Sequence, residues 1–300
     1  PPKFDWKAYL RRFIGNSSIV YTKKLRRKYN KRYSANPGLK IKFKNHICVG
    51  VDTSGSVNND ELKEFLVFEF NKAIIDATHS HCVSYKINTA FYESRGVKGW
   101  QSLEKTIEYI NENYPNHFTI ADAKRGDIGN TADQYAKAFF EAMDFDAVTV
   151  APYMGSDSIL PFLKYSEKFT IVLGLTSNAS ASEFQLHGEH YPMYKEVLSK
   201  TDRYAHAERL MYVVGATKAE ALQEIRAILP NHFLLIPGVG AQGGSLEEVL
   251  NHGLIEDYGL LINSSRGIIF ASEGDDFAIK AGEAAAELQK QMSTLLQKSF

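Results

Sequence analysis

Short runs of apolar, mostly β-branched residues alternate with amphipathic stretches from residue 46 to the end of the chain. Runs of this length and composition are typical of buried strands, and the stretches between them have the periodicity of helices. The longest of those stretches are ELKEFLVFEFNKAIIDAT, WQSLEKTIEYINENY, TADQYAKAFFEAM, TKAEALQEIRAILP and a final DDFAIKAGEAAAELQKQMSTLLQK. The apolar runs are HICVGVD, CVSYKIN, HFTIAD, DAVTVAP, FTIVLG, LMYVVGA, HFLLIP and GLLINSS.

Eight strand-helix units in succession predict a parallel sheet closed into a (β/α)8 TIM barrel. An open doubly wound sheet is the competing fold. The number of units argues against it, as does the lack of a G-x-G-x-x-G motif after the first strand. We therefore expect residues 46–300 to form one barrel domain, preceded by residues 1–45 as an extension.

The charge distribution separates that extension from the rest. The net charge of the chain is zero, but residues 1–50 hold 14 Lys and Arg against one acid, Asp5. The segment KKLRRKYNKR could contact nucleic acid or an anionic surface. We favour a solvated, partly disordered basic arm and do not expect a nucleic-acid partner.

Other features of composition indicate a cytoplasmic protein. No apolar run is long enough to cross a membrane, and the N-terminus has no signal-peptide pattern. The two cysteines, Cys48 and Cys82, each lie inside an apolar run. We expect both to be reduced core thiols rather than a disulfide or a metal pair.

Polar residues follow the strands at the end where barrel enzymes place their catalytic groups. In ADAKRGDIGNTAD (121–133), Asp122 and Lys124 are two residues apart, so an extended segment directs both to one side. Lys86 from the neighbouring strand and Asp127 could join them in a network of alternating charges. An ordinary salt-bridge cluster that closes the barrel is the alternative.

Two further segments have features of functional loops, one of a phosphate-binding site and one of a lid. PGVGAQGG (237–244) and Arg266 of NSSRG follow the seventh and eighth strands, where barrels commonly bind phosphate. A plain Gly-rich turn is the alternative. The long segment after the fifth strand, GLTSNASASEFQLHGEHYPMYKEV, is either a lid over substrate or a surface excursion, with its two histidines solvated.

These motifs resemble those of the orotidine 5′-phosphate decarboxylase family. DAKRGDIGNTA is similar to its D-x-K-x-x-D-I-G-N-T signature, and YKINTAFYE, APYMG, TSN, PGVGAQGG and NSSRGI resemble its other blocks in the same order. The similarity covers residues 68–300 and the first strand at 46–52. It implies conversion of orotidine 5′-phosphate to UMP and CO2 in pyrimidine biosynthesis, with no metal or organic cofactor.

The resemblance also implies roles for single residues. A charge network of four residues would surround the reacting carbon, with Lys124 as the proton donor to C6. Contacts to the neighbouring subunit's site imply a homodimer. The residues implied as catalytic are Lys86, Asp122, Lys124 and Asp127. Asp52 and Lys86 are expected at the ribose, Ser177 at the pyrimidine, Gln242 and Arg266 at the phosphate, and Asp127 with Thr131 at the neighbouring subunit's site; Asn88 and Gly243 are also expected to bind substrate.

Residues 1–66 are instead similar to the start of von Willebrand A-like domains of a metallopeptidase type. Their D-x-S-x-S motif, Asp52, Ser54 and Ser56, supplies oxygen ligands that suit a hard cation. The remaining ligands of such a site would come from later loops, which here match the barrel, so we expect no complete metal site. Two alternatives stay open: another phosphate-binding barrel decarboxylase, and a metal-dependent binding module.

Overall fold

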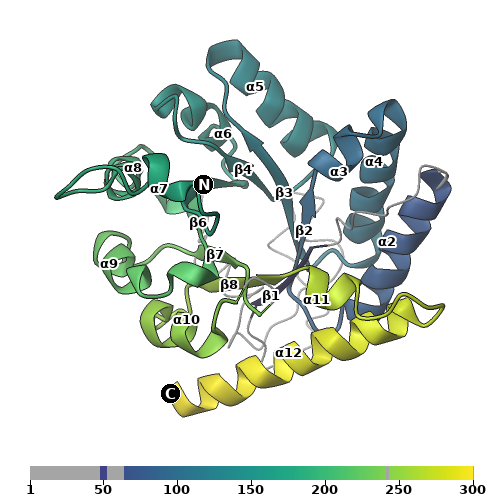
Figure 1. Cartoon of the computed structure of the whole chain (residues 1–300). Coiled ribbons are helices and arrows are strands. Elements are labelled where there is room, and N and C mark those ends of the chain that lie inside the picture. Colours follow the sequence, from purple (N-terminus) through teal and green to yellow (C-terminus); the bar gives the residue numbers. More distant parts are fainter. Residues whose placement is uncertain (1–47, 53–63, 241–242, 300) are drawn as a thin grey trace, which may run out of the picture. The chain divides into compact units, whose positions relative to one another are not determined.

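The computed structural model describes residues 48–52, 64–240 and 243–299 (Figure 1). The basic extension at 1–45, residues 53–63 with the two serines of the D-x-S-x-S motif, and Gln242 lie outside these residues. The predictions made for them are therefore not addressed by the structure.

Eight strands occur among the described residues, and each coincides with one of the predicted apolar runs. Their order along the sheet is β1 to β8, that of a closed barrel, and the pairs for which a register is defined are parallel. The predicted (β/α)8 fold is confirmed. The strands are β1 (Cys48–Asp52), β2 (Ser84–Asn88), β3 (Phe118–Arg125), β4 (Ala147–Val150), β5 (Phe169–Leu175), β6 (Leu210–Val214), β7 (Leu234–Pro237) and β8 (Leu260–Ser264).

Helices follow the strands, and the long ones lie where the amphipathic stretches predict them. They are α2 (Glu64–Thr78), α3 (Ala90–Glu93), α4 (Gly96–Asn113), α5 (Gly129–Lys137), α6 (Leu160–Leu163), α7 (Ala181–Phe184), α8 (Met193–Thr201), α9 (Ala221–Ile228), α10 (Leu246–Gly253), α11 (Arg266–Ile269) and α12 (Phe277–Ser299). Helix α5 continues as a π-helical stretch, η1 (Ala138–Ala142). No helix of the described residues combines the length and the apolar character needed to cross a membrane.

The chain divides into two compact units. Unit 1 extends to Thr119 and includes Ser265–Ser293, so it contains β1, β2, α2 to α4, α11 and most of α12. Unit 2 consists of Ile120–Ser264 and Thr294–Phe300 and contains β3 to β8 with the helices between them.

Burial on both faces explains the continuous apolar composition of the strands. All four residues of β4 and all five of β6 are buried. Strands of a parallel barrel pack against one another inside and against helices outside, so both faces select apolar side chains.

Unit 1 is held together by an apolar core with a few satisfied polar groups. Helices α2 and α4 pack side by side (Figure 1). Asn71 of α2 donates hydrogen bonds to Tyr92 Oη and Thr106 Oγ1, at 2.8 and 3.0 Å. Cys82 is buried, in agreement with the core position predicted for it.

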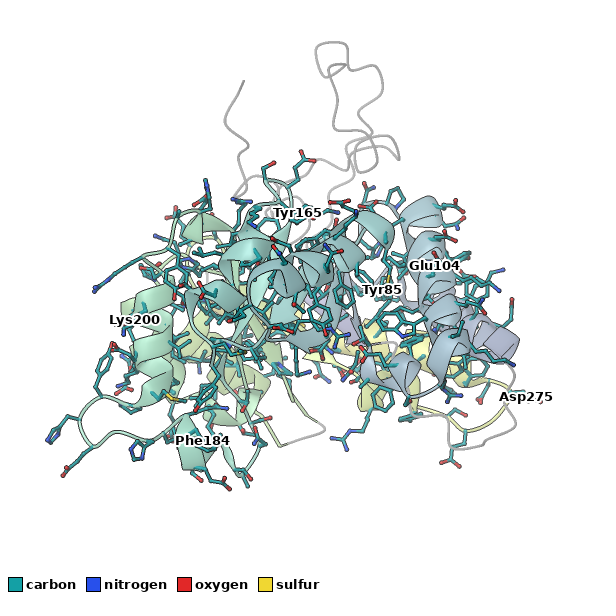
Figure 2. All side chains as sticks on the ribbon, turned by 90° about the horizontal axis from the view of Figure 1, so that it is seen from above. Tyr85, Glu104, Tyr165, Phe184, Lys200 and Asp275 are labelled. Carbon is teal, nitrogen blue, oxygen red and sulfur yellow. The ribbon has the colours of Figure 1, made fainter. Side chains whose placement is uncertain are left out.

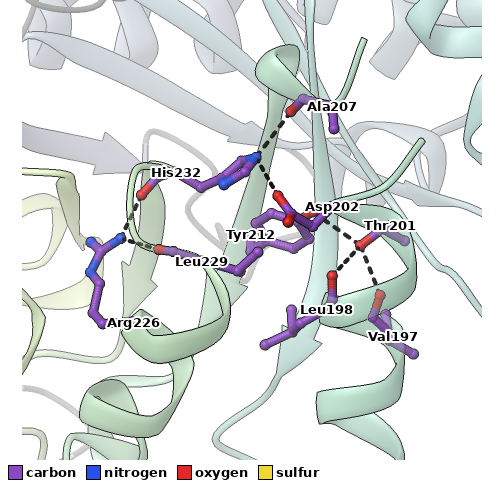
Figure 3. Close-up of polar contacts among 9 residues, drawn as sticks. All are labelled: Val197, Leu198, Thr201, Asp202, Ala207, Tyr212, Arg226, Leu229 and His232. Carbon is purple, nitrogen blue, oxygen red and sulfur yellow. Dashed lines mark hydrogen bonds and ion pairs between the residues drawn. The ribbon is translucent and has the colours of Figure 1, made fainter. Parts of the chain in front are cut away.

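In unit 2, the guanidinium of Arg226 on α9 binds backbone carbonyl oxygens of four residues. It donates to Leu229 and His232, which follow its own helix (Figure 3), and to Gly253 and Gly259 near α10. Burial lowers the pKa of Arg226 to about 10, so the group remains charged at neutral pH. One cation thus ties three chain segments together.

We expect Arg226→Met to lower the free energy of unfolding by about 3 kcal/mol, because it leaves several partly buried carbonyls without a donor. Urea unfolding followed by circular dichroism measures the change. Arg203→Ala, at an exposed arginine whose side chain makes none of these contacts, serves as the control. Equal stability of Arg226→Met and the control would contradict the account.

Candidate active site

The C-terminal end of β3 brings Asp122 and Lys124 together, as predicted. Lys124 Nζ donates to Asp122 Oδ1 at 2.6 Å. The Asp122 side chain is 11% exposed and that of Lys124 is 50% exposed, so a nearly buried carboxylate supports an ammonium that reaches solvent. A substrate at this end of the strand would meet the cation.

The backbone that joins the two residues is not regular strand, contrary to the expectation of an extended segment. Lys124 has φ +47°, a left-handed conformation that residues other than glycine seldom adopt. Thr149 of β4 lies beside it: Thr149 Oγ1 accepts a hydrogen bond from Lys124 N at 2.9 Å and donates to Asp122 Oδ1 at 3.1 Å.

The two residues expected at the subunit boundary lie just beyond the ion pair. Asp127 is half-buried, and its Oδ1 accepts a hydrogen bond from Ile128 N at 2.8 Å. Thr131 is exposed in the first turn of α5. Asp127 therefore organises the turn that leads into this helix.

Unit 1 holds four further candidate residues, three on the neighbouring strands β1 and β2 and one at the start of helix α11. Asp52 ends β1 and is the register partner of Lys86 in β2. Lys86 is 4% exposed, and Asn88 Oδ1 accepts a hydrogen bond from Ala90 N at 3.1 Å. Arg266 is exposed at the first residue of α11.

The segment after β5 is anchored at its base by Gln185. Gln185 Oε1 accepts from Thr176 N, and its Nε2 donates to Thr176 Oγ1, both at 2.8 Å. Thr176 Oγ1 in turn donates to Asn178 Oδ1 at 2.5 Å. This clamp fixes the chain on both sides of Ser177.

The outer part of the same segment carries exposed side chains. Phe184, at the end of α7, lies at the surface and is 62% exposed (Figure 2). Both histidines, His187 and His190, are exposed, as predicted. A fixed base and an exposed apolar tip are compatible with both alternatives for this segment, a lid over substrate and a surface excursion.

The glycine-rich loop after β7 folds back on itself. Gly240 N donates to Gly244 O, and Gly243 N donates to Gly240 O, at 3.0 and 2.9 Å. Gly243, predicted to contact the substrate, has φ +83°, a backbone conformation that is strained for any residue with a Cβ. The loop leads into α10, whose first turn is capped by Ser245 Oγ, which accepts from Glu248 N. The N–H groups of Gly240 and Gly243 are engaged within the loop, and it is the N-terminus of α10 after it that suits an anion.

Sequence reasoning missed two residues of this site, Thr149 and Gln185. Thr149 is the only hydroxyl-bearing residue of β4, and this polar position within an apolar run is the available signal. Gln185 lies nine residues after Thr176, directly after the short helix α7, and no periodicity relates the two. Its role is visible only in the folded structure.

Comparisons with known proteins agree with one another. The model of the Orotidine 5′-phosphate decarboxylase / HUMPS family matches residues 45–280. Proteins named orotidine 5′-phosphate decarboxylase from Flavobacterium johnsoniae and Bacteroides fragilis are 56% and 54% identical, over 87% and 85% of this chain and 96% and 94% of theirs. The solved structure of Leishmania donovani OMP decarboxylase is 33% identical, with a TM-score of 0.73, over 82% of this chain and 93% of that one.

The position of Ser177 depends on a close approach by Gly215. A Cβ at residue 215 would lie 2.7 Å from Ser177 Cβ and 2.8 Å from Ser177 N. We expect Gly215→Ala to displace Ser177 and to lower the free energy of unfolding by about 1–3 kcal/mol, because backbone atoms cannot yield as a flexible side chain can.

Chemical denaturation and a crystal structure of the variant test this. Gly274→Ala is the control, since a Cβ there meets no atom closer than 3.2 Å. If Ser177 does not move and the variant is as stable as the control, the close contact between residue 215 and Ser177 does not restrict the position of Ser177.

Proposed function

The chain belongs to the orotidine 5′-phosphate decarboxylase / HUMPS family, and on that premise we propose that it converts orotidine 5′-phosphate to UMP and CO2. The observation that carries the proposal is the ion pair of Lys124 and Asp122 at the end of β3. It places a solvent-accessible ammonium at the face where barrel enzymes bind substrate.

Lys124 is the proposed acid. The bond between C6 and the carboxylate breaks, CO2 leaves, and the electron pair remains on C6. The Lys124 ammonium stabilises that developing charge and transfers a proton to C6, which gives UMP and a neutral amine that water reprotonates. A cation already fixed beside the reacting carbon needs little reorganisation during the step.

Asp122 is the proposed support of that cation. Its carboxylate accepts from both Lys124 Nζ and Thr149 Oγ1, so its position is set from two sides. Near the carboxylate of the substrate, a second negative charge would also repel the group that departs. We assign Asp122 chiefly to holding Lys124, since fixed electrostatics account for more of such catalysis than destabilised ground states.

The remaining groups are assigned to the three parts of the substrate. The glycine-rich loop after β7 leads to the N-terminus of α10, which suits the phosphate, and the Gln185 clamp supports a pyrimidine contact at Ser177. Binding energy from the phosphate, far from C6, can then order the segment after β5. The assignments, which stay predictions, are Gln242 and Arg266 for phosphate, Ser177 for the base, and Asp52 and Lys86 for ribose, with Asn88 and Gly243 as further substrate-binding residues.

We further propose that the active form is a homodimer. Beside Asp127 lies an exposed apolar residue, Ile128, at 44% exposure, and the adjacent loop after β4 exposes Tyr153 and Met154, at 82% and 49%. The two loops are joined by the hydrogen bond from Ala151 N to Arg125 O at 2.7 Å. Exposed apolar groups in adjacent loops mark an interaction surface, and a second copy docked there would place its Asp127 and Thr131 at the site of the first copy. Action in the cytoplasm, as part of pyrimidine biosynthesis, stays a prediction from the sequence.

Replacement of the proposed acid gives the direct test. We expect Lys124→Ala to lower kcat by about four orders of magnitude or more, because it removes both the proton donor and the fixed positive charge. The fall in absorbance of orotidine 5′-phosphate measures turnover. The control is Lys200→Ala, at an exposed lysine that pairs with Glu196 on α8. Turnover by Lys124→Ala at the rate of the control would refute the assignment.

A mixed dimer tests whether Asp127 acts in the neighbouring site. Lys124→Ala and Asp127→Ala are each expected to be nearly inactive alone. In a co-expressed 1:1 mixture, heterodimers contain one site without either change, so activity should return to about a quarter of wild type. Activity no higher than that of the separate variants would place Asp127 in its own subunit's site.

A further inference from the structure

Strands β3 and β4 lose register at the ion pair. Ile120 pairs with Ala147 and Ala121 with Val148, but the next pair is Arg125 with Val150. Three residues of β3, 122–124, therefore stand opposite one residue of β4, Thr149. Such an irregularity leaves the backbone groups of the longer side without ladder partners, and irregularities of this kind are used to redirect side chains next to active sites.

The side chain of Thr149 replaces a ladder bond that the irregularity removes. Thr149 is fully buried, and its Oγ1 accepts the hydrogen bond from Lys124 N at 2.9 Å. The amide that it binds belongs to a residue with φ +47°, a conformation that persists only where the surroundings hold it. The hydroxyl is one of those holding contacts.

The same hydroxyl also reaches the carboxylate. A hydroxyl can donate one hydrogen bond while it accepts another, and Thr149 Oγ1 donates to Asp122 Oδ1 at 3.1 Å. Asp122 Oδ1 accepts from Lys124 Nζ as well, so the contacts form a closed ring through three residues. One side chain thus controls both the backbone that carries the lysine and the carboxylate that the lysine binds.

We propose that Thr149 is a positioning residue, whose hydroxyl holds the Lys124 ammonium in place by fixing Lys124 N and Asp122 Oδ1 together. The proposal rests on the proposed function for its kinetic consequences, although the geometry stands without it. A threonine that only fills space in the core would need its methyl group and its volume, whereas this role needs the hydroxyl.

The chain offers a matched set of variants. Thr149→Val keeps the shape and removes the hydroxyl, and Thr149→Ser keeps the hydroxyl and removes the methyl group. Thr170→Val makes the same change in β5, at a buried threonine whose Oγ1 has no hydrogen-bond partner among the described residues. It controls for the loss of a hydroxyl from this part of the core.

We expect Thr149→Val to lower kcat about 10- to 100-fold, as a displaced catalytic group does, while the Kd for UMP changes less than about threefold. Thr149→Ser should restore kcat to within about threefold of wild type, and Thr170→Val should leave it unchanged. Unaltered kcat in Thr149→Val, equal losses in Thr149→Val and Thr170→Val, or failure of Thr149→Ser to restore kcat would overturn the inference.

A crystal structure of Thr149→Val separates this inference from the proposed function. In this variant we expect Lys124 to leave the left-handed region, or its Nζ to move out of hydrogen-bond range of Asp122 Oδ1. An unchanged ion pair and backbone would overturn it, whatever the kinetics. Failure of the wild-type chain to release CO2 from orotidine 5′-phosphate would refute the proposed function, while this structure would still decide the role of Thr149.

Discussion

Lys124 reaches back over one residue of its own strand to Asp122, and the 2.6 Å contact between them constrains everything around the proposed site. A carboxylate that is nearly buried needs partners, because removing a charge from water costs more than a single contact returns. Lys124 Nζ and Thr149 Oγ1 are two partners of Asp122 in the part of the chain that the structure describes. The ammonium is half exposed, so it remains available to a substrate. The pair therefore links a carboxylate held in the interior to an ammonium that a substrate can reach.

The position of the ion pair depends on two kinds of backbone in unit 2, regular buried strands and the irregular stretch at residues 122–124. Strand β4 beside the site is buried throughout, and the register from β4 to β5 is uninterrupted. Against this background the chain at 122–124 departs from strand geometry, with Lys124 in a left-handed conformation. A rigid scaffold can hold such a conformation, and irregular backbone of this kind is concentrated where side chains must be aimed. The regular strands thus provide a rigid scaffold, and the irregular backbone at residues 122–124 orients the Lys124 side chain.

The sequence predicted the strands, the long helices and the meeting of Asp122 with Lys124, because burial on both faces of a barrel strand leaves a readable apolar run. It did not predict how that meeting occurs. The spacing of Asp122 and Lys124 suggested an extended segment, but the register change and the positive φ of Lys124 arise from contacts between strands, which periodicity does not encode. Thr149 was overlooked for the same reason. The clamp of Gln185 on Thr176 joins two positions of an irregular segment, where no repeat exists to relate them.

We propose that side chains of this chain alone remove CO2 from orotidine 5′-phosphate. The yield of UMP and of CO2 from that substrate, measured with the full chain in the presence and absence of excess EDTA, tests this. We expect one UMP and one CO2 for each substrate consumed, at the same rate in both conditions. No conversion, or conversion that EDTA abolishes, would contradict it.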